Sequence, residues 1–98
     1  MTRTVDKRWI VLEAIKNRTL IQVDYDRSSV TVEPHIYGAD DQGNELLLGW
    51  VVAGKSARWI TEMLNEARVV QPVTQHFAGP RPGYTNDNPR FAEIFATL

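Results

Sequence analysis

Length, composition and charge exclude several classes of protein. The chain has 98 residues, of which 43% are hydrophobic and 23% are charged, as is typical of one globular domain rather than a disordered segment. It has no cysteine, which excludes disulfides and thiolate metal sites. Eleven Lys and Arg against twelve Asp and Glu give a formal net charge of -1, whereas dedicated binders of nucleic-acid backbones usually carry a basic excess.

The termini and the hydropathy pattern bear on location. The charged N-terminal residues are not followed by a signal-peptide core, and no stretch approaches the roughly 20 apolar residues of a membrane span. We therefore expect a cytoplasmic protein that does not enter a membrane.

Residues 6–17 have the pattern of a helix. Asp6 is a helix-capping residue type, Trp9, Leu12 and Ile15 recur at helical spacing, and the last turn is basic. We expect a helix here, with its apolar stripe in the core.

Two strands are expected next. Apolar and polar residues alternate over 19–25, and the alternation resumes over 30–34 after a turn. Pro34 has no backbone N–H, so the second strand must lie at a sheet edge or bend at that point.

The apolar run at 46–53 predicts a central strand. It follows a turn signal at 40–44, is too short for a good independent helix and contains an interior glycine. Its β-branched and aromatic residues fall on both parities, which favours a strand covered on both faces.

Residues 56–68 fit two structures. As a helix, they have a Ser56 cap and apolar residues at helical spacing, including Trp59 and Met63. As a strand followed by a second short strand at 67–70, they would complete a small barrel. The local pattern alone favours the helix.

Prolines interrupt the chain from Gln71 onward. We expect 77–84 to be an extended arm ordered by packing, because prolines break regular structure there. Residues 85–88 would cap a short C-terminal helix that begins at Pro89. Its apolar face would consist of Phe91, Ile94, Phe95 and Leu98.

A series of short motifs follows one another along the chain: Ala14-Ile15-Lys16, Tyr25, Val30-Thr31-Val32-Glu33-Pro34-His35, Gly43, Glu45-Leu46-Leu47-Leu48-Gly49-Trp50 and Pro80-Arg81-Pro82-Gly83-Tyr84. The order of these motifs resembles the WYL domain, and the arm resembles that of short standalone WYL-like proteins of bacteria and phages.

The resemblance implies a mainly β fold, an SH3-like (Sm-type) small β-barrel with an N-terminal helix. Residues 1–98 would form one domain, with the helix at 6–17, the barrel strands at 19–71, and the arm and C-terminal helix at 72–98. The family places a strand within 56–68, and we adopt that strand over the helix.

The resemblance also implies a function. WYL domains act as ligand-sensing modules in bacterial transcription regulation and defence, binding nucleotides or single-stranded nucleic acid, with no enzymatic activity or cofactor attached to the domain. This chain departs from the family at its name-giving Trp-Tyr-Leu, where it has Glu45-Leu46-Leu47 or Leu46-Leu47-Leu48 and therefore lacks the Tyr hydroxyl. Val30 and Met63 stand where the family usually has arginines, so attraction to a phosphate is weakened.

One set of residues has the composition of a nucleic-acid surface, because planar side chains beside cations suit base stacking and phosphate neutralisation. The alternative is that Trp50 and Trp59 are core residues and that the cations only solvate the surface. The nearly zero net charge of the chain favours this alternative. The candidate ligand-binding residues are Tyr25, Arg27, His35, Trp50, Lys55, Arg58, Trp59 and Arg81.

Catalysis and metal binding have little support. Ser28 or Ser29, His35 and Asp40 or Asp41 have the residue types of a hydrolase triad, but no nucleophile-elbow sequence accompanies them. His35 and His76 lack paired metal-ligand spacing.

A protein partner is the remaining alternative. The arm would cover an open strand edge in its own chain or in a neighbour, and exchange of the C-terminal helix between two copies would give a homodimer. If the arm and helix pack on their own chain, that alternative loses its main support.

Overall fold

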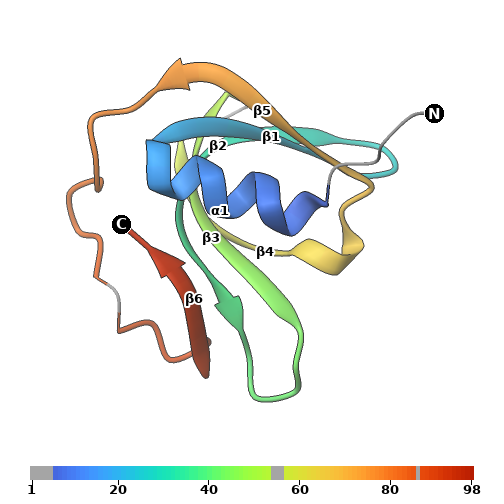
Figure 1. Ribbon diagram of the computed structural model, residues 1–98, viewed down its shortest axis with the longest axis vertical. Coiled ribbons are helices and arrows are strands. Elements are labelled where there is room, and N and C mark those ends of the chain that lie inside the picture. Colours follow the sequence, from blue (N-terminus) through green and yellow to red (C-terminus); the bar gives the residue numbers. More distant parts are fainter. Residues whose placement is uncertain (1–5, 54–56, 86) are drawn as a thin grey trace.

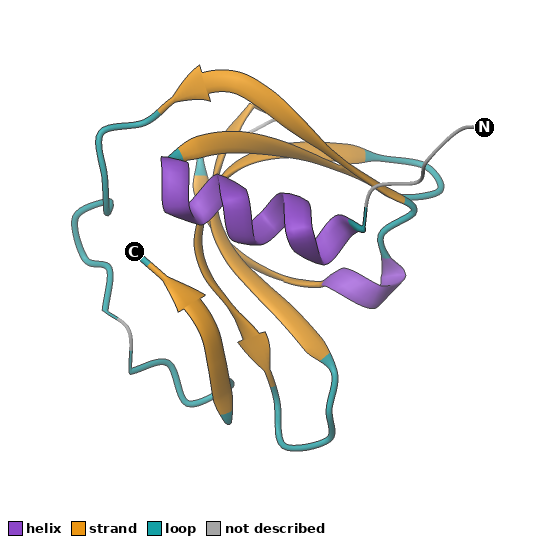
Figure 2. Ribbon diagram, in the orientation of Figure 1, coloured by secondary structure: helices purple, strands orange, loops and turns teal. Residues whose placement is uncertain are grey.

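Six antiparallel strands and one N-terminal helix make up the part of the chain that the structure describes, residues 6–53, 57–85 and 87–98 of a computed structural model (Figures 1 and 2). The strand order is β4-β3-β2-β1-β5, and β6 pairs with β2. The elements are α1 (Lys7–Asn17), β1 (Thr19–Asp24), β2 (Ser29–Ala39), β3 (Glu45–Ala53), β4 (Arg58–Met63), the 3-10 turn η1 (Leu64–Glu66), β5 (Val69–His76) and β6 (Glu93–Thr97).

The mainly β prediction is confirmed, but the sheet is open. No ladder joins β4 to β5 across the described residues, so the sheet does not close into the expected barrel. The helix lies across one face of the curled sheet, and the chain after β5 runs around the outside of the molecule before β6 returns to β2 (Figure 1).

Helix α1 begins and ends where the local chemistry predicts. The Asp6 side chain accepts a hydrogen bond from the backbone N–H of Arg8 at 2.9 Å, and Arg18 ends the helix in the left-handed conformation. The helix buries Val11, Ala14 and Ile15 against the sheet. Within the described ranges, no helix has the length and apolar character needed to cross a bilayer.

The side chain of Lys7 fixes α1 to the turn between β4 and β5. Its Nζ donates to the carbonyl oxygens of Leu64, at 2.9 Å, and Ala67, at 2.7 Å. These carbonyls follow β4, where no strand neighbour is available to them.

Strand β2 is the centre of the sheet. Residues 32–39 are all buried, because α1 covers one face and the chain after β5 covers part of the other. The first half of β2 pairs with β1 and the second half with β6, while β3 lies along its other side. Pro34 lies between the two halves and faces Gly49 of β3, next to a bulge. The strand therefore bends at Pro34 as predicted, but it is not an edge strand.

Strand β3 confirms the interior strand predicted at 46–53. It lies between β2 and β4, and Leu46, Leu47, Leu48 and Val51 are buried. The leucines alternate between the core below α1 and the opposite face of the sheet.

The helix favoured by the local pattern at 56–68 is wrong. β4 and η1 occupy the described part of this segment, with Trp59 opposite Trp50 and Thr61 opposite Leu48 in the ladder with β3. A short apolar run fits both the helical period and the strand period, and the pairing with β3 selects the strand. The strand implied by the family resemblance is the one observed.

The predicted C-terminal helix is also wrong, because the chain forms β6 there. The spacing of Phe91, Ile94, Phe95 and Leu98 is helical, but the second half of β2 offers an unpaired edge. The ladder between β6 and that edge satisfies the backbone groups of both strands. Tertiary pairing therefore overrides the local pattern.

Candidate ligand-binding site

The arm, defined as residues 77–85 and 87–92, lies over the face of β3 and β4 that is turned away from α1. Side chains at paired positions of neighbouring strands lie on the same face, which places Trp50, Trp59 and Thr61 together under the arm. The rings of Trp50 and Trp59 meet edge to face, with centroids 5.2 Å apart. This face is thus aromatic where a solvated sheet surface would be polar.

His35 is the centre of an aromatic cluster that joins the sheet to the arm. Its ring centroid lies 4.8 Å from that of Trp59, 5.1 Å from that of Tyr84 and 5.9 Å from that of Phe77. The His35 side chain is 0% exposed. The aromatic cluster, formed by His35, Trp50, Trp59, Phe77 and Tyr84, therefore holds the arm against the sheet.

The hydrogen bonds of His35 define its tautomer. The backbone N–H of Arg81 donates to Nε2 at 3.2 Å, so Nε2 carries no proton. Nδ1 therefore carries the proton and donates to the carbonyl oxygen of Glu33 at 2.8 Å. Burial lowers the pKa of His35, the charge of Arg81 lowers it further, and the contacts with Glu33 oppose the shift.

Arg81 is engaged by a carboxylate. Its Nε and Nη2 donate to the two oxygens of Glu33 at 2.8 and 2.9 Å, and the Glu33 side chain is only 7% exposed. The hydrogen bonds that the guanidinium donates to Glu33 raise the pKa of Arg81. The Arg81 Cζ also lies 5.4 Å from the ring centroid of Trp50. The charge of Arg81 is therefore already neutralised within the chain.

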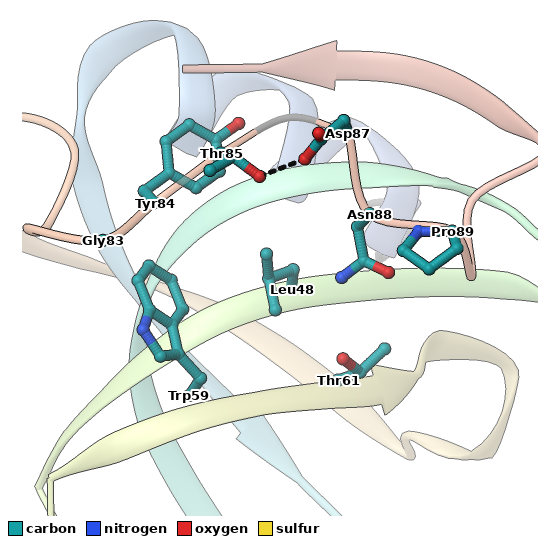
Figure 3. A pocket seen from close by; sticks show the side chains of 9 residues that line it. All are labelled: Leu48, Trp59, Thr61, Gly83, Tyr84, Thr85, Asp87, Asn88 and Pro89. Atoms are coloured by element: carbon teal, nitrogen blue, oxygen red, sulfur yellow. Dashed lines mark hydrogen bonds between the residues drawn. The ribbon is translucent and has the colours of Figure 1, made fainter.

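A pocket of about 420 Å³ lies beside the aromatic cluster, between the arm and strands β3 and β4 (Figure 3). Leu48, Trp59 and Thr61 line it from the sheet side. The arm forms the opposite wall, from which the Asn88 side chain points toward the strands (Figure 3). The arm residues that line it are Gly83, Tyr84, Thr85, Asp87, Asn88 and Pro89.

The polar groups of the pocket are partly engaged. The Thr85 hydroxyl donates to the Asp87 carboxylate, and the Asn88 side-chain oxygen accepts from the backbone N–H of Arg90 at 2.9 Å. Among the described residues, the Asn88 amide nitrogen and the Thr61 hydroxyl have no side-chain hydrogen-bond partner, which leaves them available to a ligand.

The structure brings together four of the eight predicted site residues, His35, Trp50, Trp59 and Arg81, around the aromatic cluster. Both tryptophans are half-buried, so neither is a core residue in the sense of the alternative interpretation.

The other predicted site residues lie elsewhere. Tyr25 packs at the edge of the core, where its hydroxyl donates to Glu62, and burial followed by that hydrogen bond raises its pKa. Arg27 is in the exposed turn between β1 and β2. Arg58 is exposed at the start of β4, one residue before Trp59 and therefore directed to the other face. Lys55 lies outside the described residues.

Sequence reasoning missed Glu33 as the partner of Arg81, and it missed the contribution of the arm to the aromatic cluster. Glu33 was seen as part of a strand motif, and its pairing with Arg81 spans 48 positions. Phe77 and Tyr84 were visible as aromatic residues in a proline-rich segment, which was a signal for packing. Nothing in the local pattern assigned Thr61 or Asn88 to a pocket.

The residue types of a hydrolase triad are separated. Ser28 precedes β2 and Asp40 follows it, so they lie at opposite ends of an 11-residue strand, and His35 is buried beneath the arm. Among the described residues, no group of three His, Asp or Glu is placed to hold a metal ion.

Comparisons with known proteins give no match: no family model, no curated protein and no solved structure matches the chain.

Proposed function

We propose that the chain is a non-enzymatic WYL-like binding domain with a regulatory role, built on a small SH3-like sheet of the Sm type. The motif order described above supports the family. The strand order β4-β3-β2-β1-β5 with the 3-10 turn before β5 supports the sheet type. The contact between Tyr25, just after β1, and Glu62 of β4 supports it too, because these strands are not neighbours and meet only if the sheet curls.

The site of binding is the pocket between the arm and β3 and β4. The observation that carries this assignment is the pair of rings at one end of the pocket, Trp59 and Tyr84, called here the aromatic wall. The free polar groups of Thr61 and Asn88 lie at the other end (Figure 3). A nucleobase is recognised by stacking on its face and by hydrogen bonds at its edge, and this wall and these groups supply both. A volume of about 420 Å³ is in the range of small-molecule sites. The proposed ligand is therefore nucleotide-like, or one nucleotide of a single strand.

The test is a titration observed at the tryptophan indole N–H signals by NMR. Nucleosides, nucleotides and short single-stranded RNA and DNA are added, and we expect the Trp59 signal to shift while that of Trp9 does not. Trp9 is 58% exposed on α1 and serves as an internal control. Thr61→Val should weaken the binding, whereas Thr74→Val, at an exposed position of β5, should not. Equal shifts at both tryptophans would contradict the proposed site.

A protein-binding role is the second candidate, and β6 favours it. Strand β6 pairs with β2 alone among the described strands, and Ile94 and Phe95 are 41% and 44% exposed. An unpaired strand edge with apolar side chains is a site for strand addition. The helix exchange expected from sequence has lost its basis, since β6 pairs within its own chain, but two β6 edges can pair across a two-fold axis.

Sedimentation equilibrium tests the second candidate. A concentration-dependent dimer that Ile94→Lys abolishes, and that the control Val69→Lys leaves intact, would support strand addition at β6. Val69 is similarly exposed, at 46%, but lies on β5. A monomer at all concentrations would contradict self-association.

A further inference from the structure

The charges around the pocket define which ligands it favours. Of the nine described residues that line it, Asp87 alone is formally charged, and none is Lys or Arg. Arg81 is paired with Glu33, as described above. An anionic ligand would therefore meet a carboxylate without a compensating cation in the lining.

The next arginine of the arm, Arg90, does not line the pocket either. Hydrogen bonds from Asn44 lower the pKa of the Asp40 carboxyl, and Arg90 contributes to the same shift through its charge. Arg90 is therefore within electrostatic range of the turn between β2 and β3. Arg58 precedes Trp59 on the opposite face of β4. The described arginines Arg58, Arg81 and Arg90 are not among the residues that line the pocket.

The geometry of the aromatic wall limits how a ring can bind. The ring centroids of Trp59 and Tyr84 are 6.2 Å apart with an interplanar angle of 30°. A ring held between two others requires about 7–8 Å, twice the contact distance of two carbon atoms. A ligand ring therefore stacks on one face of this wall, with its edge toward Thr61 and Asn88.

From this arrangement we propose that the pocket selects an uncharged planar heterocycle, a nucleobase or nucleoside, over its phosphorylated form. The inference rests on the proposed function and narrows it. A 5′-phosphate adds two negative charges near Asp87 and gains no cationic partner from the pocket lining. The discrimination against nucleotides therefore comes from Asp87, and the base itself is held by stacking and by the two polar groups.

The experiment compares four nucleosides, adenosine, guanosine, cytidine and uridine, with their 5′-monophosphates by NMR titration of the full chain at low salt. The nucleoside that binds best should bind about threefold or more tightly than its monophosphate, as expected for repulsion between charges several ångström apart in water. The difference should shrink in 0.5 M NaCl, where the Debye length is a few ångström.

Two variants identify the source of the discrimination. Asp87→Asn should bring the affinities for the nucleoside and its monophosphate together, whereas the control Asp41→Asn, in the exposed turn before β3, should leave the difference intact. Asp41→Asn should also leave the affinity for the nucleoside itself unchanged, because Asp41 does not line the pocket. Loss of the affinity difference in Asp87→Asn together with its retention in Asp41→Asn would identify Asp87 as the group that discriminates against the phosphate.

The outcomes separate this inference from the proposed function. If a monophosphate binds as tightly as its nucleoside and shifts Trp59, the pocket binds nucleotides and the selection against phosphate is wrong. If the preference for nucleosides survives Asp87→Asn, the charge argument is wrong. If none of the eight compounds shifts Trp59, both the inference and the nucleotide-like ligand site are overturned.

Discussion

The carboxylate of Glu33, 7% exposed on β2, and the guanidinium of Arg81, 41% exposed in the arm, form a two-point ion pair. The two partners differ in exposure, so their removal has unequal consequences. Loss of the arginine leaves a buried carboxylate without its partner, whereas loss of the carboxylate charge leaves an arginine that water reaches.

Arg81→Ala should therefore destabilise the fold more than Glu33→Gln. We expect Arg81→Ala to lower the free energy of unfolding by about 1–3 kcal/mol, the cost of an unsatisfied buried polar group. In the double variant, the cost should be less than the sum of the single costs. Urea denaturation of the four proteins measures these differences. Equal and additive costs would mean that the pair does not stabilise the arm.

Stability should fall as pH drops below about 6.5, the ordinary pKa of histidine. Burial lowers the pKa of His35 in the folded chain, so between that lowered pKa and about 6.5 the unfolded chain binds a proton that the folded chain does not. The stabilisation is complete above this window and is lost as pH falls through it. Protonation of Nε2 would also place two donors, Nε2–H and the N–H of Arg81, against each other.

Urea midpoints between pH 5 and 8 measure this dependence. His35→Gln should flatten it, whereas His76→Gln should preserve it, because His76 is exposed at the end of β5 and is the only other histidine in the sequence. The same slope in His35→Gln and wild type would contradict the assignment.

Gly38→Ala should displace β6. A Cβ at Gly38 would clash with the carbonyl oxygen of Glu93 and lie 2.9 Å from Cδ2 of Phe91, and a backbone oxygen cannot move aside by a rotamer change. We expect a loss of about 1–3 kcal/mol, typical of overpacking. Faster amide exchange in β6 should accompany it.

Gly43→Asn is the matched control for Gly38→Ala. Gly43 has a φ of +82° in the turn before β3, with open space around it, and Asn tolerates that conformation. Its effect on β6 exchange should be negligible. Unchanged β6 exchange in Gly38→Ala would show that the strand does not depend on this close approach.

Lys7→Met should loosen the junction between α1 and the turn after β4. The variant removes two hydrogen bonds, to the carbonyls of Leu64 and Ala67, and keeps most of the apolar stem. We expect a loss of about 1–2 kcal/mol, in the range for hydrogen bonds from a charged group. Lys16→Met, exposed in the last turn of α1, is the control and should change stability little. Thermal or urea unfolding distinguishes them.

Local signals were sufficient for some elements and not for others. α1 was predictable because its cap and its periodicity lie within one short segment. β6 was not, because its backbone partners lie on β2, more than fifty positions earlier, and the apolar spacing of 91–98 is helical. For the segment at 56–68, the apolar pattern fits a helix and a strand almost equally well, and only the pairing with β3 decides between them.

The candidate site shows the same division. The aromatic and cationic residue types were visible, and four of them do converge. Arg81 reaches this cluster through its ion pair with Glu33, which lies 48 positions earlier in the sequence. The same ion pair neutralises the charge that suggested Arg81 as a phosphate ligand. The pocket itself requires the arm to fold back, which no spacing rule predicts.

The division of β2 between two partners has a consequence for the order in which the chain assembles. Residues 7–76 contain α1 and five strands whose ladders are complete without the C-terminal segment, while β6 and the arm attach to surfaces already formed. Residues 77–98 should thus behave as a separate cooperative unit that docks last and opens first. A ligand held between the arm and β4 contacts both units, so its binding should slow the opening of β6 without slowing global unfolding to the same degree.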